Sequence, residues 1–137
     1  MVAHSMTPGE LETAVERCQI ILSHAWMVRT FVKHSPEAEE FPELMLLPRT
    51  VFDVSRSLES RKGDPEAYFR QLGKKLRRLK EAAEQFTREA PLASTHTNFQ
   101  QAAISYRACV DELAAIHRAA TAGHPPLTTN TPPDPVL

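Results

Sequence analysis

Apolar residues recur along this chain at alternating steps of three and four positions, the spacing that places them on one face of an α-helix. The pattern predicts four helices and no paired strands. We expect these helices at about residues 8–34, 43–62, 65–90 and 98–122. In the first helix the apolar positions are Leu11, Val15, Cys18, Leu22, Ala25 and Val32. Amphipathic helices with mostly short connections favour an all-α fold, an antiparallel four-helix bundle, as a single domain over residues 1–122.

Two of the predicted helices begin at recognisable start signals. Thr7 is a good N-cap residue, Pro8 suits the first helical position, and Glu10 supplies negative charge in the first turn. Thr97 with Gln100 resembles a capping box and predicts the start of the last helix.

Prolines and glycines predict where the helices are interrupted. Pro48 lies inside the second apolar pattern, so this helix is either kinked or broken at Pro48, with a short turn before a helix that starts there. Residues 61–63 (Arg-Lys-Gly) are typical of a C-terminus, with basic charge on the last turn followed by a glycine able to adopt a left-handed conformation. Pro91 is expected to end the third helix. The proline-rich residues 123–137 predict a flexible, disordered tail.

The first helix carries a second apolar face besides the one that repeats along its length. This face consists of Ile20, His24, Met27 and Phe31. A helix of a four-helix bundle normally buries one broad apolar face, so either this helix is central or the second face contacts another chain. The latter interpretation predicts a dimer with these four residues at the interface.

Arg29 occupies the main apolar face, where an apolar residue is expected. A buried guanidinium needs a carboxylate or several carbonyl partners. Asp53, Asp111 and Glu112 on other helices are possible partners. Alternatively, the apolar face ends near this point and the Arg29 side chain extends to solvent. The sequence leaves both possibilities open.

The composition restricts the class of protein. The chain has 137 residues, of which 42% are hydrophobic and 24% charged, with a formal net charge of −1. Such a balance favours a folded domain and gives no overall electrostatic attraction to nucleic acid or to a membrane. Cys18 and Cys109, both in helical patterns, are expected to be reduced thiols. The longest mostly apolar run has 11 residues and includes Ser23 and His24, so we expect a soluble, cytoplasmic protein.

Residues 70–80 form the one strongly charged segment, with six basic residues and no acidic one. Lys74, Lys75, Arg77 and Arg78 are the candidate residues for binding an anion or an acidic partner. The alternatives are that they form a solvated helix face, or that they pair with the acidic connector Glu37, Glu39, Glu40 and Glu43.

The sequence offers little support for catalysis. Arg29 and His34 in "RTFVKH" fit the Arg-x4–6-His spacing of HEPN-type helical ribonucleases, and this resemblance implies action on RNA phosphate. The same spacing also occurs at Arg17/His24 and Arg118/His124. No histidine follows a glutamate at the spacing of di-iron sites, and no Cys-x-x-Cys or His-x3-His pair is present for zinc. We therefore expect neither a metal nor another cofactor.

The leading functional hypothesis is a non-enzymatic interaction or regulatory module that self-associates and binds an unidentified protein partner. The alternative is an HEPN-like ribonuclease or an RNA- or anion-binding bundle that uses Arg29, His34 and the basic residues 70–80.

Overall fold

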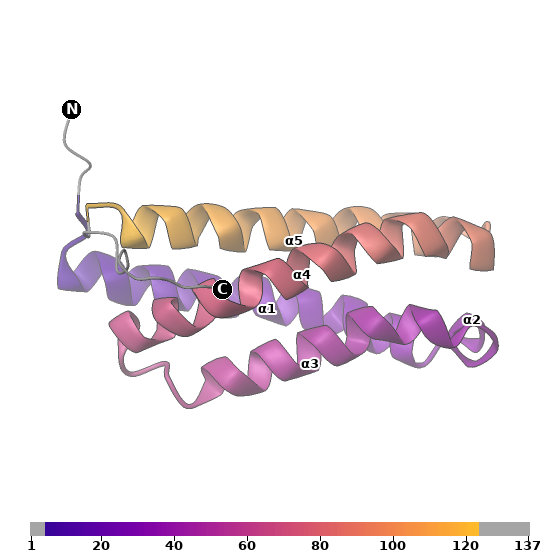
Figure 1. Ribbon diagram of the computed structural model, residues 1–137, viewed down its shortest axis with the longest axis horizontal. Coiled ribbons are helices and arrows are strands. Elements are labelled where there is room, and N and C mark those ends of the chain that lie inside the picture. The colour runs from indigo at the N-terminus through magenta and orange to yellow at the C-terminus, as the bar shows by residue number, and fades with distance from the viewer. Residues whose placement is uncertain (1–4, 124–137) are drawn as a thin grey trace, which may run out of the picture.

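The computed structural model describes residues 5–123, and within them it is all-helical, without strands (Figure 1). The four long helices are α1 (Pro8–Lys33), α3 (Leu46–Glu59), α4 (Pro65–Ala93) and α5 (Thr97–Thr121). A five-residue helix, α2 (Pro36–Glu40), and a 3-10 helix, η1 (Pro42–Met45), connect α1 to α3. The predicted all-α class is confirmed.

The long helices lie side by side, and consecutive ones run in opposite directions (Figure 1). α1 packs against α3 and α5, and α4 packs against the same two helices. The core lies between them because each helix turns its apolar face inward. The main apolar face predicted for α1 is buried apart from the partly exposed Leu11. Each large apolar side chain removed from water contributes roughly 1.5–3 kcal/mol to stability.

Two tyrosines deep in the core keep their hydroxyl groups hydrogen-bonded. The Tyr68 hydroxyl donates to Gln19 Oε1 at 2.7 Å, which ties α4 to α1. The Tyr106 hydroxyl donates to the Leu79 carbonyl at 3.3 Å, which ties α5 to α4. A buried polar group without a partner would cost about 1–3 kcal/mol, so these bonds make the burial of both rings tolerable.

The start of α1 agrees with the prediction. Thr7 Oγ1 accepts from the Glu10 backbone N–H at 3.1 Å, and Glu10 Oε1 accepts from the Thr7 backbone N–H at 2.8 Å. This reciprocal pair is a capping box, which satisfies two backbone donors that the helix leaves free.

The second helix, predicted over residues 43–62 as kinked or broken at Pro48, is divided into η1 and α3, and α3 starts at Leu46 and not at Pro48. Pro48 lies in the first turn of α3, where a backbone N–H is not needed by the helix. α3 ends at Glu59, and the expected left-handed glycine cap at Gly63 is wrong, because Gly63 has no positive φ. Instead, the Arg61 guanidinium donates to the Ser57 carbonyl, one of the acceptors left free in the last turn.

α4 continues beyond Pro91, so the predicted end at residue 90 is wrong. Proline lacks the N–H that would donate to the carbonyl four residues earlier, and its ring crowds that carbonyl, so it often kinks or ends a helix. The helix continues around it, and the Ser94 N–H donates to the Ala90 carbonyl at 3.0 Å.

The N-cap of α5 is His96, so the capping box predicted for Thr97 and Gln100 is wrong. His96 Nδ1 accepts from the Asn98 N–H at 3.1 Å, and Thr97 is the first helical residue. The imidazole nitrogen of His96 therefore caps the helix in the way that a serine or threonine hydroxyl usually does. At the other end of α5, Gly123 has a φ of 86°. The rest of the predicted tail, residues 124–137, lies outside the described residues.

Candidate functional site

The second apolar face of α1 lies on the surface of the molecule. We call Ile20, His24, Met27 and Phe31 the outer face of α1. Ile20 is 52% exposed, Met27 65% and Phe31 38%, and His24 is also exposed. Phe31 makes one contact inward, with its ring centroid 5.2 Å from that of Phe99. The four helices thus leave most of this face in contact with solvent.

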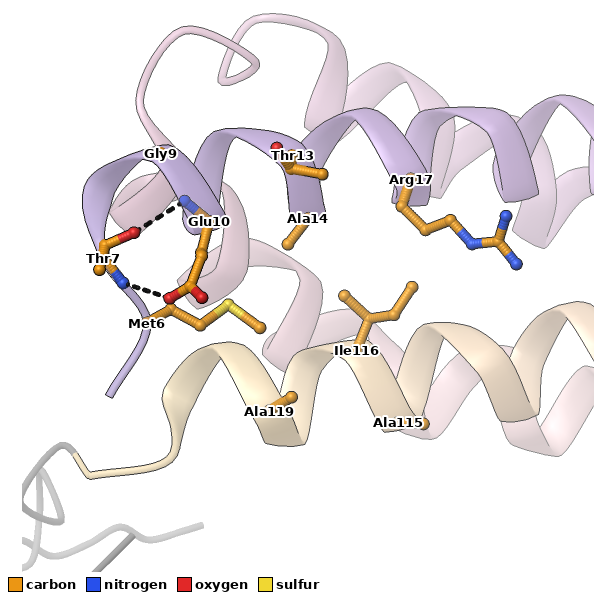
Figure 2. Close-up of a pocket in the computed structure, with 10 residues that line it drawn as sticks. All are labelled: Met6, Thr7, Gly9, Glu10, Thr13, Ala14, Arg17, Ala115, Ile116 and Ala119. Carbon is orange, nitrogen blue, oxygen red and sulfur yellow. Dashed lines mark hydrogen bonds between the residues drawn. The ribbon is translucent and has the colours of Figure 1, made fainter. Parts of the chain in front are cut away.

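A pocket of about 850 Å³ lies between α1 and α5, near the N-terminus of α1 (Figure 2). In Figure 2 Ala14 and Ile116 face each other across the gap between the two helices. Most of the lining residues are small or apolar, and Glu10 and Arg17 are the charged ones. Besides Ala14 and Ile116, the pocket is lined by Met6, Thr7, Gly9, Glu10, Thr13, Arg17, Ala115 and Ala119. The pocket is open to solvent.

Two of the predicted anion-binding residues on α4 are paired within the chain. Lys75 Nζ lies 3.0 Å from Asp53 Oδ2 on α3, and Arg78 Nη1 lies 3.1 Å from the same oxygen. Asp53 thus joins α3 to α4, and its negative charge offsets part of the positive charge of the basic segment.

The other two predicted anion-binding residues are more exposed. Arg77 Nε lies 3.4 Å from Glu81 Oε2, one helical turn along α4. Lys74 is exposed and forms no ion pair among residues 5–123. An exposed pair of this kind is worth little, so Arg77 stays available to a partner.

Arg29 is half-buried and stacks on aromatic rings. Its guanidinium carbon lies 4.0 Å from the centroid of the Trp26 ring and 5.6 Å from that of Phe52. Two of its three candidate partners are engaged elsewhere, Asp53 as described and Glu112 with Arg17 at 3.5 Å. Cation–π contacts therefore take the place of the carboxylate that the sequence suggested.

The sequence contains a partial signal for this arrangement. Trp26 precedes Arg29 by three positions, a spacing that brings two side chains together on a helix. The contribution of Phe52, and the ring contact between Trp26 and Phe52 at 6.1 Å, depend on how α3 packs against α1. Sequence reasoning therefore missed the second ring.

The two residues of the HEPN-like pattern line different pockets. Arg29 lies in a pocket between α1 and α3, whereas His34 lines a pocket with Phe31, His96 and Phe99 beside α5. Because the two side chains face different neighbours, the structure does not unite them around one groove.

The cysteines are free thiols in the core. Cys18 is fully buried and Cys109 nearly so. Burial raises the pKa of the Cys18 thiol to about 12 and also raises the pKa of Cys109. A thiolate is the reactive form, so neither group is prepared to act as a nucleophile.

Two further properties concern the described part of the chain. Over residues 5–123, no three His, Cys, Asp or Glu side chains gather where they could hold a metal ion. None of the helices in this range has the length and apolar character needed to cross a membrane.

Comparison with known proteins finds no family model, no curated protein and no solved structure that matches the chain.

Proposed function

We propose that this chain is a four-helix bundle that acts as a non-enzymatic interaction module and self-associates through the outer face of α1. The observation that carries the proposal is the exposure of Ile20, Met27 and Phe31 within about 40° of arc on one helix. A contiguous apolar strip of this kind is favourable to remove from water, and such strips mark interaction surfaces.

The order of large and small residues along α1 supports a second copy of the chain as the occupant. Gly9 and Phe31 lie eleven positions before and after Ile20, and Thr13 and Met27 lie seven positions before and after it. A two-fold axis through Ile20 would bring the large side chains of one copy over the small residues of the other. The space above Gly9 is open, since a Cβ there would have only Thr7 Oγ1 nearby, at 4.0 Å.

The same arrangement makes use of the α1–α5 pocket. Gly9 and Thr13 lie on its wall, so Met27 and Phe31 of a second copy would reach it. At its edge the Arg17–Glu112 ion pair joins opposite charges within one copy, so the Arg17 charge is partly offset there. An apolar pocket at one end of a face and bulky apolar side chains at the other are self-complementary.

A non-enzymatic role and a cytoplasmic location, which we also propose, are supported by the chemistry of the cysteine, arginine and histidine side chains. Both cysteines are free of disulfides and have raised pKa values, and Arg29 and His34 line separate pockets. Free thiols are typical of reducing compartments. The contacts of α1 and α4 with both α3 and α5 support the bundle arrangement.

The test is light scattering coupled to size-exclusion chromatography. We expect the wild type to be a dimer and Met27→Glu/Phe31→Glu to be a folded monomer, because burying two carboxylates in the contact is unfavourable. Leu92→Glu is the matched control, since Leu92 is an exposed apolar residue on α4, outside this face. It should leave the dimer intact. A wild type that stays monomeric at high concentration would contradict the proposal.

A further inference from the structure

A second pocket, of about 410 Å³, lies between α1 and α3. Three cationic side chains line it, Arg29 and Lys33 from α1 and Arg49 from α3. Its apolar part is formed by Met45, Pro48 and Phe52. We call this site the basic pocket. Arg29 follows Ile20 by nine positions, which is half a turn around the helix, so the basic pocket lies on the opposite side of α1 from the outer face.

Arg29 is held in a state suited to bind an anion. Its guanidinium carbon lies over the Trp26 ring, 4.0 Å from the centroid, and an aromatic ring accepts no strong hydrogen bond from the guanidinium N–H groups. The Nε atom is buried and has no hydrogen-bond partner among the described residues. The Arg29 side chain as a whole makes one hydrogen bond among the described residues, a long contact of 3.5 Å from Nη1 to Thr30 Oγ1. A buried donor without an acceptor is costly, and a bound anion would remove that cost.

The positive charge of the pocket is not compensated within the described part of the chain. No carboxylate lines the pocket, and none of Arg29, Lys33 and Arg49 forms an ion pair among residues 5–123. Asp53, the carboxylate one position after Phe52, is occupied by Lys75 and Arg78 of α4. The basic segment of α4 is therefore partly neutralised, whereas the basic pocket keeps its charge.

We propose that the basic pocket binds a phosphate monoester whose organic group is apolar or aromatic. A phosphate monoester carries close to two negative charges at pH 7 and offers three strong acceptor oxygens, which match two guanidinium groups and one ammonium group. The apolar floor would contact the organic group. The volume lies in the range of small-molecule pockets, roughly 300–1,000 Å³. This binding activity goes beyond self-association and uses a different surface.

Trp26 provides a direct readout, because it is the only tryptophan and contacts Arg29. Phenyl phosphate is the probe, and Trp26 fluorescence is excited at a wavelength that the probe does not absorb. We expect a saturable change, with inorganic phosphate and phenol both binding more weakly than phenyl phosphate. Arg49→Gln and Lys33→Gln should each weaken binding about tenfold, as expected for the loss of a charge-assisted hydrogen bond.

Arg107→Gln is the matched control, since Arg107 is an exposed cation on α5, away from the pocket. It should leave the affinity for phenyl phosphate unchanged. Equal weakening by Arg107→Gln, or no saturable change in the wild type, would overturn the proposal. Equal binding of phenol would also overturn it. If a short RNA binds more tightly than phenyl phosphate and loses affinity in Arg49→Gln, the source of phosphate is a nucleic acid and the small-ligand proposal is wrong.

Discussion

Gly73 of α4 and His117 of α5 meet where these two helices pack. A Cβ added at Gly73 would lie 2.7 Å from His117 Nε2, closer than two such atoms can approach. Burial lowers the pKa of His117, and the polar backbone of Phe69 opposes this effect in part. Glycine is thus required at position 73 because the His117 ring lies so close to it, and not because of its backbone conformation.

This contact predicts that Gly73→Ala and His117→Ala are coupled. Alanine in place of glycine in a helix is normally worth about 1 kcal/mol. In the wild type Gly73→Ala displaces the imidazole from its packed position, so most of that gain should disappear. In the His117→Ala background the full gain should appear. Denaturant unfolding of the four proteins measures the coupling, and simple additivity would contradict the close contact.

Gly63→Ala is the control for this cycle. No atom lies within 4 Å of a Cβ at Gly63, so its effect on stability should not depend on His117. The pKa of His117 gives an independent readout by NMR titration. Displacement of the ring toward solvent in Gly73→Ala should raise this pKa back toward its ordinary value.

At the scale of the helix, α1 and α5 differ in how they begin. Both start next to a threonine in a similar sequence context, but Thr7 is an N-cap with a capping box, whereas Thr97 is the first residue inside α5 and His96 caps it. The sequences alone do not separate the two cases, since His96 is not among the usual capping residues.

Thr7→Ala and Thr97→Ala therefore form a matched pair. We expect Thr7→Ala to lower the free energy of unfolding by about 1 kcal/mol, the usual cost of a lost N-cap. Thr97→Ala should cost much less, because its side chain supplies no cap. The two variants are compared by the midpoint of denaturant unfolding, which reports a change in stability when the dependence of the unfolding free energy on denaturant is unchanged. Equal destabilisation by both substitutions would contradict the assignment of His96 as the cap.

At the scale of the whole molecule, the two cysteines report on the integrity of the core. Cys18 lies on α1 and Cys109 on α5, and both are buried among side chains of the neighbouring helices. Burial raises the pKa of Cys18 to about 12, so its thiolate is scarce near neutral pH. Reaction with a thiol reagent requires that the helices separate.

We expect thiol modification of the native protein to be much slower than that of the unfolded chain and to accelerate with denaturant in parallel with unfolding. Cys109→Ala leaves Cys18 as the only thiol, and Cys18→Ala leaves Cys109, so the two can be followed separately. If either thiol of the native protein reacts at the rate of an exposed cysteine, that cysteine is not buried between the helices.

The two faces of α1 give the molecule two distinct surfaces. The outer face carries exposed apolar side chains, whereas the side toward α3 carries Arg29 and the basic pocket. These two surfaces lie on opposite sides of α1, and Arg49 of α3 lines the second one. Substitution of Met27 should therefore affect self-association, and substitution of Arg49 should affect anion binding, each without the other.

The sequence by itself determined the helical class, the main apolar faces and the cap at Thr7. These features depend on the 3.6-residue helical period and on contacts between near neighbours, which a single segment contains. It also indicated that Ile20, Met27 and Phe31 form a second face.

The tertiary structure alone decided which charges are paired. Lys75 and Arg78 share Asp53, and Arg29 rests on a ring from another helix, because helix packing brings together residues more than twenty positions apart. The continuation of α4 past Pro91 was likewise not predictable from the proline itself. A local rule gives the cost of a broken hydrogen bond, but only the packed structure shows whether neighbouring contacts, such as the buried Ala90, offset that cost.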